Sequence, residues 1–301
     1  MYKRQLETLA HCGAFDSMQT NRAKLDAVLD EALHLAQAHQ QGQQSGQHSL
    51  FELMDENEVK STETQLIYPE LRDWKHHQRL KLEKDSLGFY VSGHPLDGFA
   101  SDIRELAVTT MQLQEGDLKE QEVVSLAGIV VSKTIRLSRS SEKFAIILLE
   151  DLRGSLEFPI FARVYAQTAD LLEKDEPLLF TGRVNRRDDG MSLMVDRIRR
   201  LSDVRSEEAK TLDIWLDQEN CSPERIRMLR GMLQKHPGEI SVQLIIRPNQ
   251  ESQVSIKLDE KISAHPALID EFEEERLWLK PSFHYHQTPE ILQRHSRAVA
   301  Y

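Results

Sequence analysis

Carboxylates that stand side by side are the residues of this chain with the clearest potential for metal-assisted chemistry. They occur as Glu150 with Asp151, as Asp188 with Asp189, and as the acidic run 273–275. Two-metal phosphoryl transfer needs such groups to converge on one site. These groups instead fall at an expected strand end, an expected hairpin tip and an expected helix face, where turn formation and solvation explain them. A nuclease that uses them is the alternative, and it predicts metal-dependent cleavage by the purified chain.

The histidines and cysteines do not follow a metal-ligand pattern. His76 adjoins His77, and His284 stands two residues before His286, but no cysteine or carboxylate lies beside them at ligand spacing. The chain has 2 cysteines, far apart, which excludes a disulfide framework and a four-cysteine metal site. It also has no phosphate-binding glycine loop and no nucleophile elbow. We therefore expect no catalytic residue, no metal and no cofactor in this chain.

The composition is that of a globular protein with room for two or three domains. The chain has 301 residues, of which 40% are hydrophobic and 29% charged. Its net charge of -11 argues against generic nucleic-acid binding, yet acidic and basic residues nearly balance over 133–205, whereas 251–275 is strongly acidic. Any DNA contact should therefore lie in the middle. No apolar run could cross a bilayer and no signal peptide is evident, so we expect a cytoplasmic location without a membrane partner.

The first part of the chain is expected to be helical. A short helical pattern stops at Gly13, and apolar residues then recur at helical spacing from Leu25 to Ala36. A Gln- and Gly-rich tract over 39–48 predicts a flexible linker, and a further helical pattern covers 69–90. We assign these segments as a helical region at 1–38, a linker at 39–60 and a helical connector at 61–121.

The hydrophobic period changes to that of β-strands in the middle of the chain. One helix, expected over 165–173, separates the third strand from the fourth, which is the order of a five-stranded oligonucleotide-binding (OB) barrel at 122–203. The expected strands are 122–137, 143–150, 155–161, 177–184 and 192–200.

The last part predicts a small α+β domain at 211–280, after a charged linker at 203–210 and before a tail at 281–301 that receives no role. Its elements alternate as strand, helix, strand, strand, helix and strand. They are expected at 211–216, 223–234, 240–246, 253–258, 266–274 and 277–279. The expected fold class is thus multi-domain, α then β then α+β.

Basic residues cluster where OB barrels bind single strands, across the second and third strands and in the loops that join strands one and two and strands four and five. Phe144, Phe158 and Phe161 offer stacking surface for bases. The alternative is that the phenylalanines belong to the core and the arginines to a solvated face. The candidate DNA-binding residues are Lys133, Arg136, Arg139, Lys143, Arg153, Arg163, Arg183, Arg186, Arg187 and Arg197.

A short apolar motif follows the Gln-rich tract. Gln47 and Ser49 precede Leu50 and Phe51, so one amide and two apolar side chains are carried on a flexible segment. This arrangement suits docking into a preformed apolar groove of a partner. The alternative is that Leu50 and Phe51 pack on the next helix.

Several runs of this sequence resemble the C-terminal part of the alpha subunit of bacterial DNA polymerase III. Residues 6–16 (Leu-Glu-Thr-Leu-Ala-His-Cys-Gly-Ala-Phe-Asp) are similar to the end of that family's helix-hairpin-helix region, and 21–23 (Asn-Arg-Ala) to its next helix. The most specific run is 82–96 (Leu-Glu-Lys-Asp-Ser-Leu-Gly-Phe-Tyr-Val-Ser-Gly-His-Pro-Leu). In the barrel, the resemblance rests on 127–130, 149–154, 171–175 and 182–184, and it extends to about Lys280.

The resemblance implies a role for each part. Gln47, Ser49, Leu50 and Phe51 correspond to the family's sliding-clamp motif. The barrel is implied to hold single-stranded template DNA, and 211–280 to bind the tau subunit of the clamp loader. The family's catalytic aspartates and palm lie upstream of the matching region. We therefore expect a fragment of a DNA-directed DNA polymerase that is inactive alone and works with the remaining core subunits. The alternative is a stand-alone single-stranded-DNA-binding OB protein without a polymerase partner.

Overall fold

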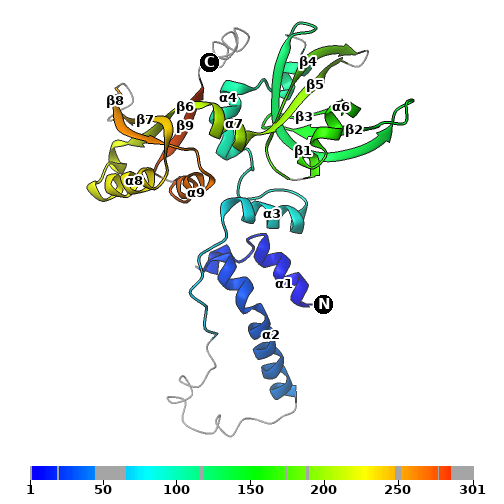
Figure 1. Ribbon diagram of the computed structural model, residues 1–301. Helices are drawn as coiled ribbons and strands as arrows, with labels where there is room; N and C mark the ends of the chain where they lie inside the picture. Colours follow the sequence, from blue (N-terminus) through cyan, green and yellow to red (C-terminus); the bar gives the residue numbers. More distant parts are fainter. Residues whose placement is uncertain are drawn as a thin grey trace. The chain divides into compact units, whose positions relative to one another are not determined.

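The computed structural model describes residues 2–18, 20–44, 66–115, 118–173, 175–187, 190–247, 252–276 and 278–285. It divides into two compact units, Met1–His94 and Pro95–Tyr301, drawn together in Figure 1. The expected connector at 61–121 is therefore shared between the two units. No helix among these residues is long and apolar enough to span a membrane.

The first unit is helical, but two expected bounds are wrong: α2 continues to Gln44, into the expected linker, and the helix expected over 69–90 covers only 76–87. Its elements are α1 (Tyr2–His11), the 3-10 turn η1 (Asp16–Met18), α2 (Arg22–Gln44) and α3 (His76–Leu87). Its buried apolar residues include Ala10, Leu25, Val28 and Leu80. Helix α3 ends at Gly88, whose φ of 83° is the left-handed conformation that glycine adopts without a Cβ clash.

The barrel is the first β-domain of the second unit. Its strands are β1 (Val123–Leu137), β2 (Lys143–Glu150), β3 (Ser155–Ile160), β4 (Leu178–Arg187) and β5 (Gly190–Arg200). They pair antiparallel in the order β3-β2-β1-β4-β5, and β3 also contacts β5, which closes the barrel. Helix α6 (Ala162–Thr168) and the turn η5 (Leu171–Glu173) join β3 to β4. This is the expected OB topology.

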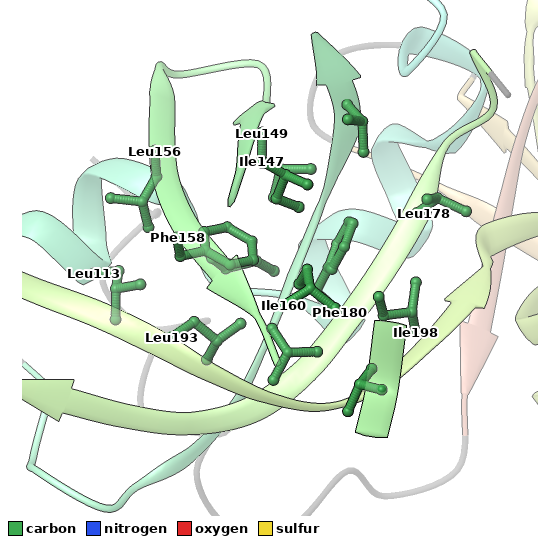
Figure 2. Close-up of a cluster of buried hydrophobic side chains, with 14 of the residues drawn as sticks. Leu113, Ile147, Leu149, Leu156, Phe158, Ile160, Leu178, Phe180, Leu193 and Ile198 are labelled. Atoms are coloured by element: carbon green, nitrogen blue, oxygen red, sulfur yellow. The ribbon is translucent and has the colours of Figure 1, made fainter. Parts of the chain in front are cut away.

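Alternate residues of every strand fill the barrel. Figure 2 shows the apolar side chains converging in the interior, among them Ile147 of β2, Phe158 of β3 and Phe180 of β4. The rings of Phe158 and Phe180 meet edge to face with centroids 5.7 Å apart. Phe158 is 1% exposed. It is therefore a core residue and offers no stacking surface.

The C-terminal domain is a four-stranded sheet in the order β8-β7-β6-β9, with the helices α8 and α9. Strands β6 and β7 are parallel and joined through α8, while β8 and β9 pair antiparallel with their neighbours. Ser222 caps α8 and Pro223 begins it, as the sequence predicts. The elements are β6 (Ala209–Asp217), η6 (Gln218–Asn220), α8 (Pro223–Lys235), β7 (Pro237–Arg247), β8 (Val254–Ile262), α9 (Pro266–Glu274) and β9 (Lys280–Tyr285).

Two expectations about this domain are wrong. The charged segment at 203–210, predicted as a linker, is mostly the helix α7 (Leu201–Glu208). It is helical because Leu201, Val204 and Arg205 are all buried. The last strand is not at 277–279 but at Lys280–Tyr285, so the first residues of the expected tail complete the sheet.

Helices α4 (Ala100–Leu106) and α7 join the barrel to the C-terminal domain, after the turn η4 (Asp97–Phe99). Leu96, Ile103 and Leu201 pack with Ile129 and Leu179 from the outside of the barrel. Helix α5 (Thr110–Gln114) then leads into β1 and begins with a capping box formed by Thr109 and Gln112.

A buried ion pair crosses this junction. The Arg205 side chain of α7 is 3% exposed and binds the carboxylate of Asp102 in α4, which is 0% exposed. Its guanidinium also lies 4.2 Å from the ring centre of Phe99 and 4.8 Å from that of Phe283 in β9. The Tyr285 hydroxyl donates to Asp102, and burial raises the pKa of Tyr285. One charged pair thus links α4, α7 and β9.

Candidate nucleic-acid interface

The outer face of β1, β2 and β3 carries a cation beside aromatic surface. Arg136 of β1 lies directly opposite Phe144 of β2. Because the neighbouring Ala145 is 0% exposed in the core, alternation turns Phe144 and Arg136 to the outside of the barrel. Phe161 follows β3 and is 49% exposed. Phe161 is thus about half exposed and Phe144 half-buried, at the second and third strands, across which OB barrels bind single strands.

Most of the candidate basic side chains around this face have no carboxylate partner among the described residues. Arg136, Arg139 and Lys143 lie on or beside the loop between β1 and β2, and all are exposed. Arg153 and Arg163, on either side of β3, are exposed as well. Cations that are not neutralised by the protein are the ones that can bind phosphates.

The other candidate DNA-binding residues differ from one another in exposure and in pairing. Lys133 donates to Glu173 at 2.6 Å and is largely covered. Arg183 lies 3.8 Å from Asp196 at the surface of the β4–β5 hairpin, while Arg186 and Arg197 are exposed. The side chain of Arg187 lies outside the described residues. The strand register places Arg163 at the same end of the barrel as Lys143, whereas Arg153 lies in the β2–β3 turn at the other end of β2. The basic residues of β4 and β5 lie on a second hairpin.

Apolar residues near the end of the β1–β2 hairpin are exposed on the opposite side of β1 from Arg136, and the sequence interpretation missed them. Ile135 is 50% exposed and Leu137 is 67% exposed. Ile135 lies opposite the buried Ala145 and Leu137 lies opposite Lys143, so the strand pattern alone places both on the inward side. They are exposed because β1 and β2 extend beyond the barrel, which only the strand lengths reveal.

The linker motif Gln47, Ser49, Leu50 and Phe51 lies outside the described residues. Its assignment to clamp binding stays a prediction.

The three N-terminal runs that resemble DNA polymerase III alpha meet in one ion-pair network in the first unit. Arg22 donates to Asp16 and to Glu83, each at 2.7 Å. Glu83 is 0% exposed and also accepts the backbone N–H groups of Val91 and Ser92. Burial alone would raise the pKa of Glu83, but the hydrogen bonds from Ser92, Arg22 and Val91 outweigh it and lower the pKa to about 2. These residues hold the fold together.

The acidic residues of the barrel also have structural roles. Asp151 is 7% exposed and accepts the N–H and hydroxyl of Thr110 together with the N–H groups of Arg153 and Gly154. It fixes the turn between β2 and β3 to α5. Among the described residues, no three His, Cys, Asp or Glu side chains group as a metal site would require.

A closed five-stranded barrel with a basic, aromatic outer face defines a class of nucleic-acid-binding module. The family model of the OB-fold nucleic acid binding domain matches residues 124–201. That span agrees with the barrel from β1 to β5.

The resemblance to the alpha subunit of DNA polymerase III is confirmed over about nine-tenths of the chain. The subunit of Neisseria meningitidis serogroup B is 30% identical over 279 residues, which are 91% of this chain. Those of Mycobacterium tuberculosis H37Rv and Pasteurella multocida are 27% and 26% identical over 90% and 88% of it. The chain spans about a quarter of the length of these relatives. A solved domain of replication protein A from Methanococcus maripaludis covers 31% of the chain at 17% identity, with a TM-score of only 0.24.

Proposed function

We propose that this chain is the C-terminal DNA-guiding and partner-binding region of a replicative DNA polymerase III alpha subunit. The similarity to these subunits and the OB-fold domain support the proposal. The observation that carries it is the outer face of the barrel, where Arg136, Phe144 and Phe161 lie beside cations without protein partners.

Single-stranded template is the ligand that this face suits. A base stacked on an exposed aromatic ring contributes about 1 to 3 kcal/mol, and neutralising phosphates releases counterions. Phe161 and Phe144 provide the rings, while Arg136, Arg139 and Lys143 stand at the loop end of the same face. Since the chain as a whole carries a net charge of -11, this local basic surface restricts DNA to the barrel.

Anisotropy of a labelled oligo-dT twenty-mer tests this proposal with the full chain. We expect the pair Phe144→Ala and Phe161→Ala to weaken binding by about tenfold or more, the equivalent of about 1.4 kcal/mol. Phe89→Ala is the matched control, because Phe89 is 60% exposed in the first unit. Arg136→Gln should instead reduce the salt dependence of binding. Unchanged affinity in the double phenylalanine variant would remove the barrel face from the proposal.

The partners of the proposed region follow from the same family similarity. The motif Gln47, Ser49, Leu50 and Phe51 would tether the chain to the sliding clamp, and the domain at 211–280 would contact the tau subunit of the clamp loader, beside the other core subunits. A labelled peptide of residues 42–55 should bind the purified clamp saturably. The same peptide with Gln47, Leu50 and Phe51 changed to alanine should not. Equal binding by both peptides would reduce the segment to a linker.

We further infer that polymerase chemistry is supplied by residues outside this chain. Two acidic groups that are buried in the barrel and junction, Asp151 and Asp102, are engaged in a turn and in an ion pair. A primer-extension assay with Mg²⁺ and all four nucleotides should show no extension by the purified chain. Extension that survives repurification would contradict this inference.

A further inference from the structure

A hollow of about 510 Å³ lies between the sheet of the C-terminal domain and the segment of η4 and α4. Trp215 and Asp217 at the end of β6 and Arg247 at the end of β7 line it, with Lys280 at the start of β9 and Arg104 of α4. The parallel strands β6 and β7 both end here. In open sheets with a strand–helix–strand crossover, the carboxyl ends of the parallel strands are where ligands bind.

Four cations line this hollow: Arg104 of α4, Arg247 of β7, Lys280 of β9 and Arg276 in the turn after α9. The charge of Arg276 acts on the carboxylate of Glu273, and Arg247 lies opposite Asp217 in the β6–β7 register, whereas Arg104 and Lys280 form no ion pair with a described residue. The Arg247 guanidinium lies 4.4 Å from the ring centre of Trp215, which orients the charge over an aromatic surface. Arginines held on aromatic rings are characteristic of recognition sites for anionic groups, because less entropy is lost when they bind.

The floor of the hollow is rigid and apolar. Leu279 and Leu216 are 0% and 1% exposed. Trp278 is 7% exposed, donates its indole N–H to Glu275 and lies under the guanidinium of Arg225. A floor that is already packed needs no rearrangement to receive a ligand.

Three carboxylates, Asp97, Asp217 and Glu273, also line the hollow and restrict the kind of anion it accepts. Burial raises the pKa of Glu273 more than the nearby charges of Arg276 and Arg205 lower it. A run of phosphates would meet these groups repeatedly. A peptide can instead place carboxylates against the arginines and neutral side chains against Asp217 and Glu273.

We propose that this hollow binds a short acidic peptide segment of a partner protein, with glutamate or aspartate side chains on Arg104 and Arg247 and an apolar residue over Trp215. This goes beyond the DNA binding proposed for the barrel, and it does not depend on the partner being the clamp loader.

Fluorescence anisotropy with the full chain tests the proposal. The probe is a labelled peptide of four Glu-Glu-Leu repeats, compared with the same peptide built from Gln-Gln-Leu. The unmodified chain should bind the glutamate peptide saturably and at least tenfold more tightly than the glutamine peptide. Replacing Arg104→Glu and Arg247→Glu together should weaken the glutamate peptide by at least tenfold, and Arg104→Gln with Arg247→Gln should weaken it in the same direction.

The matched control is Arg227→Glu with Arg230→Glu, which changes the net charge equally on the exposed side of α8. It should leave peptide binding within about twofold. Thermal unfolding of each variant separates a binding defect from a folding defect, and the glutamine pair keeps side chains of moderate size if the glutamate pair unfolds.

A labelled oligo-dT twenty-mer distinguishes this proposal from the function of the barrel. Its affinity should be the same for the unmodified chain and the Arg104 and Arg247 variants. Absence of glutamate-peptide binding, or an equal loss in the α8 control, overturns the proposal. Loss of oligo-dT binding in the Arg104 and Arg247 variants would assign the hollow to nucleic acid instead. Loss of oligo-dT binding only in the Phe144 and Phe161 variants would support DNA binding by the barrel and leave the hollow as a separate peptide site.

Discussion

Removal of the Arg205 side chain should destabilise the second unit strongly, although it lies in no proposed binding site. Arg205→Met leaves the Asp102 carboxylate, which is 0% exposed, without its cation and with neutral donors, the Tyr285 hydroxyl and, at 3.5 Å, the Ser101 hydroxyl. Breaking one partner of a buried pair costs about 3 to 5 kcal/mol. In a unit of this size, about 1 kcal/mol lowers Tm by about 2 to 4 °C. The expected loss is therefore about 6 to 20 °C.

Replacing both partners distinguishes the free-energy cost of leaving one charge unpaired from the net contribution of the ion pair to stability. The double variant Asp102→Leu with Arg205→Met keeps apolar bulk at both positions, so it should recover most of the stability lost by Arg205→Met alone. Urea unfolding followed by circular dichroism gives the coupling free energy of the cycle. Arg199→Met is the control, since the partners of Arg199 among the described residues are the exposed Glu207 and Glu208, and it should cost at most about 1 kcal/mol.

A loss below about 1 kcal/mol in Arg205→Met would refute this reasoning. So would a double variant that is no more stable than the single one.

Three further predictions concern stability. Glu83 has a pKa lowered to about 2, so its contribution is present above the unfolded pKa and lost as pH falls toward 2. Glu83→Gln should therefore cost about 3 kcal/mol near neutral pH and progressively less below about pH 4, measured as free energies of unfolding in urea. The hydrogen bond with Glu105 raises the pKa of His284 more than burial lowers it. Its contribution is complete below the unfolded pKa of about 6.5 and lost as pH rises through the raised value, so His284→Gln should destabilise more at about pH 6 than at about pH 9. Gly182→Ala would place a Cβ 2.2 Å from the backbone oxygen of Met194, and an unfolding cost below about 1 kcal/mol would contradict that contact.

Much of the fold could be predicted because local patterns determine it. Period-two apolar residues locate all five barrel strands, and the helix between β3 and β4 identifies the topology. Ser222 and Pro223 mark the start of α8 because capping depends on neighbouring residues alone.

The nature of the binding face was only partly predictable. Phe144, Phe158 and Phe161 were equivalent candidates, since each belongs to a strand-like segment. Phe158 belongs to the core and Phe161 is exposed. The difference depends on which side of each strand faces the barrel interior, and that is set by pairing with β2 and β5. The exposure of Ile135 and Leu137 likewise depends on how far β1 extends past its neighbours.

The sequence by itself determined the order of the segments, the strand and helix periods, and the resemblance to polymerase alpha subunits. Tertiary structure alone decided that 203–208 is helical and that Phe283 and Tyr285 belong to a sheet. The reason is that both depend on partners distant in the sequence. Arg205 is buried only because Asp102 neutralises it, 103 residues away. The charged and polar residues of these segments therefore predicted solvent exposure, although a partner distant in the sequence makes their burial favourable.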